Sequence, residues 1–171
     1  MTRNVLRGLG VLLLWVAACL PDDIPGPPQV GEMAPEFQAV SFDDGRMVSL
    51  ADYRGQTILV NLWATWCAPC RLETPYLQSI YEEYQDRGLM IVGVSVDSPS
   101  ALDLAREFLE EMSVTYDILH DPDMVSTDVF LPIGYPASYL IDSEGVVRFT
   151  RLGPILEGDP AFLEALEQAL E

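Results

Sequence analysis

Two cysteines separated by two residues lie where a predicted strand passes into a predicted helix, and this junction constrains the fold more than any other feature. The apolar, β-branched run at residues 57–60 predicts a buried strand, and apolar side chains recur at helical spacing after Cys70. A helix N-terminus offers free N–H groups and the positive end of the helix dipole, which stabilise a thiolate at Cys67. Because side chains three residues apart lie on nearly one helix face, the two sulfurs can form a disulfide.

Two other interpretations of this pair are open: half of a zinc site, or a chance pair of core cysteines. Zinc takes about four ligands, and the chain has no second Cys-x-x-Cys pair. The strand–motif–helix context favours redox chemistry over both. Ala68 and Pro69, which separate the cysteines, are expected to tune the reduction potential, because they alter the N–H groups that face Cys67.

Four segments of the chain form a pattern found in a known family. They read Ala-Pro-Glu-Phe at 34–37, Leu-Ala-Asp-Tyr-Arg-Gly at 50–55, Trp-Ala-Thr-Trp-Cys-Ala-Pro-Cys-Arg at 63–71 and Gly-Tyr-Pro-Ala-Ser-Tyr-Leu-Ile-Asp at 134–142. On these segments the chain resembles the thioredoxin superfamily and, within it, the membrane-tethered TlpA/ResA-like thiol–disulfide oxidoreductases. The resemblance implies an α/β thioredoxin-like fold: a central mixed sheet with helices on both faces, an N-terminal β-hairpin extension and a helix–strand insertion.

The alternation of strands and helices along the chain also predicts a sheet with helices on both faces. We expect strands at 37–41, 46–50, 57–62, 89–96, 116–119, 137–141 and 146–151, and helices after Cys67, from Pro99, at 124–130 and from Asp159. In the helix after Cys67, apolar side chains at helical spacing predict a stripe that faces the core. Its members are Leu72, Tyr76, Leu77, Ile80, Tyr81 and Tyr84.

Residues 1–18 are typical of a bacterial export signal. Arg3 and Arg7 form a positive n-region, and the apolar stretch that follows is shorter than the about 20 residues that a bilayer requires. Residues 16–19, Val-Ala-Ala-Cys, resemble a lipobox, so we expect cleavage before Cys19 and its diacylation. An ordinary secretory signal is the alternative. Lipidation of Cys19 would account for the odd number of cysteines and leave two, Cys67 and Cys70, as a redox pair.

The chain after the signal divides into a tether and one domain. Residues 19–35 are rich in proline and are expected to form an extended, semi-rigid tether that lifts the domain from the membrane. Residues 36–171 form the expected thioredoxin-like domain. The formal net charge of −18 argues against nucleic acid as a partner and against electrostatic adhesion to anionic lipid. An acidic, soluble surface and a preference for basic partners are both compatible with this charge.

We expect Cys67 to be the nucleophile, which attacks a substrate disulfide, and Cys70 to be the resolving thiol. The resemblance implies that Cys67 is exposed and Cys70 covered. It also implies a cis peptide bond at Pro136, whose neighbour Tyr135 would pair its backbone with the bound substrate chain. Trp66 and Tyr135 would then form an aromatic docking patch, or would merely pack on each other.

A proton acceptor for Cys70 is predicted from the resemblance. Thioredoxin has a buried aspartate six residues before its first cysteine. In this chain Asn61 occupies that position, and its amide side chain cannot titrate. TlpA/ResA-like proteins have a glutamate three residues after the second cysteine, which is Glu73 in this chain. Glu73 is therefore either the proton acceptor or a surface acid stabilised by the helix N-terminus. His120, the one histidine, is expected to be a solvated loop residue rather than a metal ligand or catalytic group.

The resemblance implies a lipid-anchored, extracytoplasmic reductase that acts on a disulfide-bearing protein. Apocytochrome c and a copper-site assembly protein are its candidate substrates, and a membrane thiol transporter of the DsbD/CcdA type is its expected electron donor. No cofactor and no metal are expected.

Two alternatives are a thiol peroxidase and a copper-binding assembly module. Peroxiredoxins place a Pro-x-x-x-Thr-x-x-Cys pattern at the nucleophile, but Thr65 lies two residues before Cys67. Copper modules use Cys-x-x-x-Cys with a distant histidine, although copper(I) could still bind this dithiol.

Overall fold

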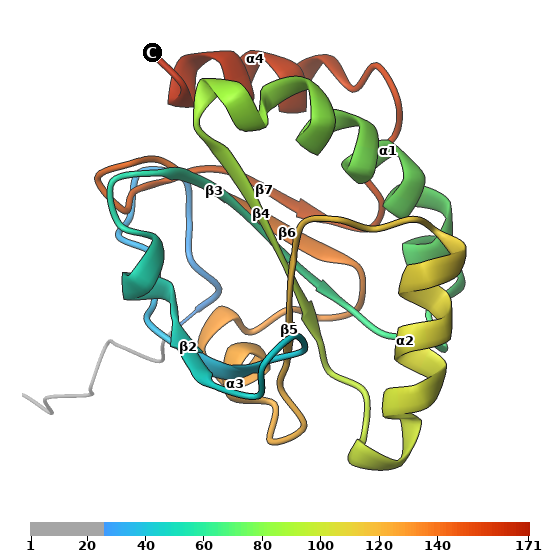
Figure 1. Cartoon of the computed structure of the whole chain (residues 1–171). Helices are drawn as coiled ribbons and strands as arrows, with labels where there is room; N and C mark the ends of the chain where they lie inside the picture. Colours follow the sequence, from blue (N-terminus) through green and yellow to red (C-terminus); the bar gives the residue numbers. More distant parts are fainter. Residues whose placement is uncertain (1–25) are drawn as a thin grey trace, which may run out of the picture.

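The computed structural model describes residues 26–171, which form a mixed seven-stranded sheet with helices on both faces (Figure 1). The strand order is β2-β1-β5-β4-β3-β6-β7. The strands are β1 Gln38–Ser41, β2 Met47–Ser49, β3 Thr57–Trp63, β4 Leu89–Ser95, β5 Asp117–His120, β6 Ala137–Ile141 and β7 Val147–Leu152. The helices are α1 Ala68–Tyr84, α2 Leu102–Glu111, α3 Val125–Phe130 and α4 Pro160–Ala169, with short 3-10 turns at Leu50–Tyr53, Gln85–Arg87 and Pro99–Ala101. The predicted thioredoxin-like fold is confirmed.

The central strands β3, β4 and β5 are parallel, and their C-terminal ends lie in register. Trp63 of β3 pairs with Ser95 of β4, and Ser95 pairs with His120 of β5. Because parallel strands end at the same edge of a sheet, the segments that follow these three strands meet there. The cysteine pair follows β3, so this edge is where the candidate site is built.

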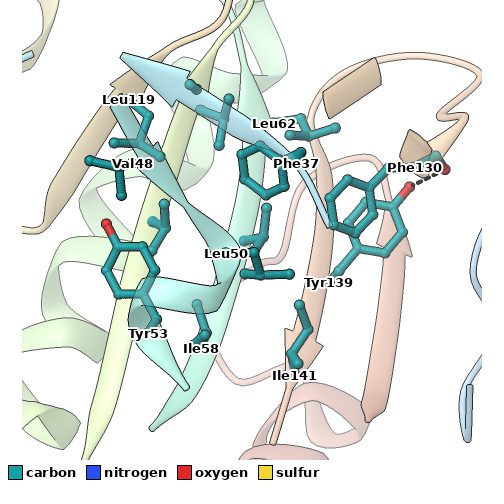
Figure 2. Close-up of a cluster of buried hydrophobic side chains, with 14 of the residues drawn as sticks. Phe37, Val48, Leu50, Tyr53, Ile58, Leu62, Leu119, Phe130, Tyr139 and Ile141 are labelled. Atoms are coloured by element: carbon teal, nitrogen blue, oxygen red, sulfur yellow. Dashed lines mark hydrogen bonds between the residues drawn. The ribbon is translucent and has the colours of Figure 1, made fainter. Parts of the chain in front are cut away.

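Helices α1 and α4 cover one face of the sheet, whereas α3 lies on the other, and the N-terminal hairpin forms one edge of the sheet (Figure 1). On the α3 side of the sheet lies a cluster of buried side chains that includes Phe37, Phe130 and Tyr139 (Figure 2). Phe130 packs on both rings, with centroid distances of 5.7 Å to Phe37 and 4.5 Å to Tyr139. Burial of aromatic area is the main contribution of such a cluster to stability. Ala39 of β1 and Val48 of β2 belong to the same cluster, so the hairpin strands extend the sheet and contribute to its core.

The predicted core stripe of α1 is wrong for one residue. Leu72 is largely exposed, whereas Leu77 and Ile80 are buried as expected. The polar residues Glu73 and Thr74 are buried in place of Leu72. The second turn of α1 thus directs polar groups inward, which hydrophobic spacing alone does not reveal.

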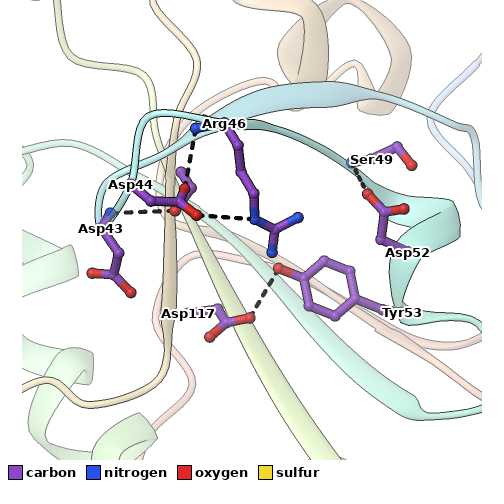
Figure 3. Close-up of polar contacts among 8 residues, drawn as sticks. Asp43, Asp44, Arg46, Ser49, Asp52, Tyr53 and Asp117 are labelled. Atoms are coloured by element: carbon purple, nitrogen blue, oxygen red, sulfur yellow. Dashed lines mark hydrogen bonds and ion pairs between the residues drawn. The ribbon is translucent and has the colours of Figure 1, made fainter.

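A polar contact attaches the 3-10 turn after the hairpin to β5, which with α2 forms the expected helix–strand insertion (Figure 3). The Tyr53 hydroxyl donates a hydrogen bond of 3.0 Å to Asp117. Burial and the nearby Asp117 carboxylate raise the pKa of Tyr53. At the hairpin turn Arg46 pairs with Asp44 at 3.3 Å, and the Ser49 N–H donates to Asp52. The Tyr53 contact and the pairing of β1 with β5 join this region to β5, whereas the Arg46 and Ser49 contacts are local.

The described part of the predicted tether lies along the domain. The Gly31 N–H donates to the Val147 carbonyl, and the Val147 N–H donates to the Glu32 carbonyl. Cys19, the expected cleavage site and the first residues of the tether lie outside the described residues. Within residues 26–171, no helix combines the length and the apolar character needed to cross a membrane.

Candidate active site

Cys67 caps the N-terminus of α1 and forms a disulfide with Cys70. The Cys70 N–H donates a hydrogen bond of 3.2 Å to the Cys67 sulfur. The Cys67 N–H in turn donates to the Ala64 carbonyl and closes a turn between β3 and the helix. Pro69 lies in the first turn of α1, where a missing N–H costs no helical hydrogen bond. A thiolate at Cys67 would face an N–H donor and the positive end of the helix dipole.

The expected exposure of Cys67 is wrong for this disulfide form. Cys67 is 4% exposed and Cys70 is 0% exposed. Both belong to a buried cluster that includes Trp63, Ala105 and Phe108, so residues of the insertion helix α2 help to cover the pair. The insertion therefore shields the sulfurs more than the motif alone predicts.

Trp66, Tyr135 and Pro136 lie together as expected. The Tyr135–Pro136 peptide bond is cis. The rings of Trp66 and Tyr135 meet edge to face with centroids 5.8 Å apart, and Trp66 is 68% exposed. Thr127 of α3, which sequence reasoning missed, shares a hydrogen bond of 2.7 Å with the Tyr135 hydroxyl. The two aromatics thus pack on each other and also present an apolar surface beside Cys67.

Glu73 is buried, which argues against the surface-acid interpretation. It is 1% exposed, and its two carboxylate oxygens accept hydrogen bonds from the Asn61 amide and the Ile155 N–H, both at 2.8 Å. Desolvation raises the pKa of Glu73 to about 7, although the Ile155 and Asn61 hydrogen bonds act in the opposite direction. Glu73 lies three residues after Cys70 and so on the same side of α1. A buried carboxyl group that titrates near neutral pH suits proton transfer.

Asn61 is the partner of Glu73 that sequence reasoning did not identify. Its amide nitrogen donates to Glu73 and also to the Ser138 hydroxyl, at 2.9 Å. Asn61 of β3 and Ser138 of β6 are paired in the sheet, and Glu73 lies above them on α1. A polar residue in the otherwise apolar β3 run was the available signal, because a buried amide requires partners.

A second buried carboxylate lies beside the cysteine turn and was also missed. Asp97, which follows β4, accepts hydrogen bonds from the Thr65 N–H at 3.0 Å, the Thr65 hydroxyl at 2.8 Å and the Ser95 hydroxyl at 2.9 Å. The expectation for His120 is wrong: it is buried at the end of β5, and its Nε2 lies 2.8 Å from the Asp97 carbonyl oxygen. The register of β4 and β5 places His120 there.

Within the described residues 26–171, no cluster of three or more His, Cys, Asp or Glu side chains has a geometry suited to a metal ion. The chemistry available at this site is that of the two sulfurs, the buried Glu73 carboxyl group and the surrounding hydrogen-bond donors.

Comparisons with known proteins agree with the geometry. Residues 30–150 match the model of the AhpC/TSA family. The thiol-disulfide oxidoreductase ResA of Oceanobacillus iheyensis is 34% identical over 123 residues, which are 70% of this chain and 63% of that protein. The chain thus spans less than two thirds of this relative. The thioredoxin-like protein YneN of Bacillus subtilis is 34% identical over 126 residues, 73% of this chain and 72% of that protein.

A solved structure shares most of this architecture. The putative thiol:disulfide interchange protein DsbE from Chlorobium tepidum superposes with a TM-score of 0.76 at 27% sequence identity. The superposition covers 84% of this chain and 99% of that one. The fold therefore has a counterpart in a protein described as a putative thiol:disulfide interchange protein.

Proposed function

Because this chain belongs to the AhpC/TSA family and, within it, to the ResA-like thiol–disulfide oxidoreductases, we propose that it reduces disulfides in proteins outside the cytoplasm. The observation that carries this proposal is the Cys67–Cys70 disulfide at the N-terminus of α1 beside the buried Glu73. A dithiol in this position can be cycled between two oxidation states while the fold around it is kept.

In the proposed reaction the reduced protein donates two electrons. The Cys67 thiolate attacks a substrate disulfide, so that a mixed disulfide forms and one substrate sulfur leaves as a thiolate. The Cys70 thiolate then attacks the Cys67 sulfur, which releases the second substrate thiolate and forms the Cys67–Cys70 disulfide. The substrate thiolates take up two protons, and a second dithiol must return two electrons to the protein.

Glu73 is proposed to accept the Cys70 proton as the mixed disulfide resolves. Asn61 cannot take a proton, and Cys70 is buried away from solvent. Glu73 lies three residues further along α1, and its pKa of about 7 allows it to hold or release a proton at neutral pH. Its contacts with Asn61 and Ile155 hold the carboxyl group in place.

Trp66, Tyr135 and Pro136 are proposed to bind the substrate chain next to its disulfide. The exposed Trp66 ring offers apolar contact, and the Tyr135 backbone lies at the cis bond where an extended chain can pair by strand addition. Ala68 and Pro69 are proposed to tune the reduction potential through the N–H groups facing Cys67. The match to thiol–disulfide oxidoreductases supports this arrangement without assigning a substrate.

An anchored, extracytoplasmic location is part of the proposal and rests on the sequence of residues 1–19. An oxidising compartment would require a dedicated electron supply, for which a membrane thiol transporter of the DsbD/CcdA type is the proposed donor. Apocytochrome c and a copper-site assembly protein are the proposed substrates.

Trapping tests the function and names the substrate. Cys70→Ser should stop the reaction at the mixed disulfide, so that substrates remain bound to Cys67 and can be identified by mass spectrometry. Cys67→Ser is the matched control and should trap nothing. Insulin reduction by the dithiol form should be abolished by Cys67→Ser. Hydroperoxide consumption and anaerobic copper(I) titration measure the two alternative functions. Peroxidase activity or copper(I) binding in a protein that does not reduce insulin would reject the reductase proposal.

A further inference from the structure

We propose that Asp97 is a positioning residue of the redox site: through Thr65 it holds the turn that carries Cys67, and its buried negative charge disfavours the Cys67 thiolate. The proposal rests on the thiol–disulfide exchange proposed above. It concerns a group that belongs neither to the cysteine pair nor to the Glu73 hydrogen-bond network. In the sequence, Asp97 precedes Ser-Pro and resembles an ordinary residue before a helix.

Asp97 reaches the cysteine turn because β3 and β4 are parallel and end in register. Its carboxylate is almost fully buried and accepts both the N–H and the hydroxyl hydrogen of Thr65. A third donor is the Ser95 hydroxyl, which also accepts the Asp97 N–H at 3.3 Å. The residues after the two strands are thereby joined by side-chain hydrogen bonds where the backbone ladder ends.

Thr65 transmits this contact to the nucleophile. It lies in the turn between Ala64 and Cys67, which the Cys67 N–H closes on the Ala64 carbonyl. With its N–H and its hydroxyl both held by Asp97, Thr65 cannot rotate without breaking two hydrogen bonds to a buried carboxylate. The direction from which Cys67 enters α1 is therefore restrained from outside the helix.

Within residues 26–171, no arginine or histidine side chain forms an ion pair with the Asp97 carboxylate. His120, from β5, contacts the Asp97 backbone carbonyl instead. Arg71, which follows Cys70 on α1, pairs with Glu111 and lies over the Phe108 ring. The donors to the carboxylate are neutral, so its charge is uncompensated next to the cysteine turn.

This charge opposes the effect of the helix N-terminus on Cys67. Two residues of extended chain span at most about 7 Å, and with the hydrogen bond to Thr65 and the length of the Cys67 side chain this places the carboxylate within about 14 Å of the Cys67 sulfur. In a buried region a second anion at that distance is unfavourable. A less stable thiolate makes the dithiol less stable relative to the disulfide, and hence a stronger reductant.

Asp97→Asn tests the charge, because it removes the charge and keeps the shape. In the reduced protein, the pH profile of Cys67 alkylation by iodoacetamide should move to lower pH. The alkylation rate at pH 6 should rise about three- to tenfold. The equilibrium with glutathione should move toward the dithiol by a similar factor. Asp142→Asn is the matched control. Asp142 is also buried and hydrogen-bonded, but it follows the C-terminal end of β6, at the edge of the sheet away from the cysteine turn. Asp142→Asn should lower the stability of the protein but leave the alkylation profile and the glutathione equilibrium unchanged.

Thr65→Val tests the positioning and keeps the charge, so the proposal remains testable if Asp97→Asn does not fold. At a pH where Cys67 is fully ionised, Thr65→Val should reduce insulin about three- to tenfold more slowly. Thr65→Ser, which keeps the hydroxyl group, should restore the rate.

A Thr65→Val rate within twofold of the wild type would overturn the positioning role. An Asp97→Asn alkylation profile that matches the wild type would overturn the charge effect. Failure of the wild-type dithiol to reduce insulin would instead reject the proposed function, and the alkylation profile can be measured in either case.

Discussion

The Asn61 amide donates a hydrogen bond of 2.8 Å to the Glu73 carboxylate, and this contact joins the strand before the cysteines to the helix that carries them. The same amide nitrogen reaches Ser138 on the neighbouring strand. The sheet therefore holds the carboxyl group that we propose as proton acceptor. Asn61, at the position of the thioredoxin aspartate, cannot accept a proton; it hydrogen-bonds the carboxyl group that we propose for this role.

Glu73→Gln should slow resolution of the mixed disulfide without preventing its formation. The amide keeps the size of the side chain but cannot accept the Cys70 proton. General-base catalysis contributes about 10²–10⁴-fold. Because a thiol proton can also leave to water, we expect the rate of resolution to fall about tenfold. Stopped-flow measurement of mixed-disulfide decay would show it, together with the loss of a titration near pH 7. An unchanged rate and pH profile would make Glu73 a structural residue only.

The stability of the protein should depend on pH through Glu73. Its pKa is about 7 in the folded protein against an ordinary value of 4.5, so between these values the folded state holds a proton that the unfolded chain releases. The corresponding stability is fully present below pH 4.5 and is lost as the pH rises to 7, by up to about 3 kcal/mol. Urea unfolding of the wild type and Glu73→Gln at several pH values measures the difference. Parallel curves for the two proteins would contradict the raised pKa.

Asn61→Leu should raise the pKa of Glu73 further, because the Asn61 hydrogen bond stabilises the carboxylate. The pH profile of resolution should move to higher pH. The free energy of unfolding should fall by about 1–3 kcal/mol, since a buried acceptor loses its donor. Ser138→Ala is the control: it removes the other acceptor of the same amide and leaves the Glu73 contact in place. A profile that moves to lower pH in Asn61→Leu would show that this contact does not act on Glu73 as described.

Trp66→Ala should weaken the binding of protein substrates and change stability little. The side chain is mostly exposed, so its loss should alter the free energy of unfolding by about 0.5 kcal/mol or less. We expect KM for a protein disulfide to rise several-fold with kcat nearly unchanged. Leu104→Ala on α2 removes a comparably exposed apolar side chain from another surface and should have no effect on KM. Equal KM values for the two variants would place substrate docking elsewhere.

Cys19→Ser should release the protein from the membrane fraction if the lipobox interpretation holds. A serine cannot be diacylated through a thioether, and each buried CH₂ of an acyl chain contributes about 0.8 kcal/mol to anchoring. Fractionation followed by immunoblotting measures the distribution, and mass spectrometry of the wild type detects the acyl chains. A Cys19→Ser protein that stays membrane-bound and uncleaved would identify the apolar segment as a membrane-spanning helix.

The architecture and the cysteine pair could be predicted from the chain because both depend on local patterns. The β-branched run before Cys67, the helical spacing after Cys70 and the alternation of strands and helices are properties of neighbouring residues. They predicted the strands, the helix N-terminus at Cys67 and the disulfide. The roles of Cys19 and of residues 1–18 remain predictions of the same kind, since they lie outside the described residues.

What could not be predicted are the contacts made across the sheet. Whether Glu73 is a surface acid or a buried proton acceptor depends on Asn61 and Ile155, which lie 12 and 82 residues away along the chain. The contact between Asp97 and Thr65 depends on the register of β3 and β4. Hydrophobic periodicity indicates which side of a helix or strand is buried, but it contains no information on which polar groups meet there. His120 and Cys67 were misjudged because elements from elsewhere in the chain pack against them, and Leu72 because the polar residues Glu73 and Thr74 are buried in its place.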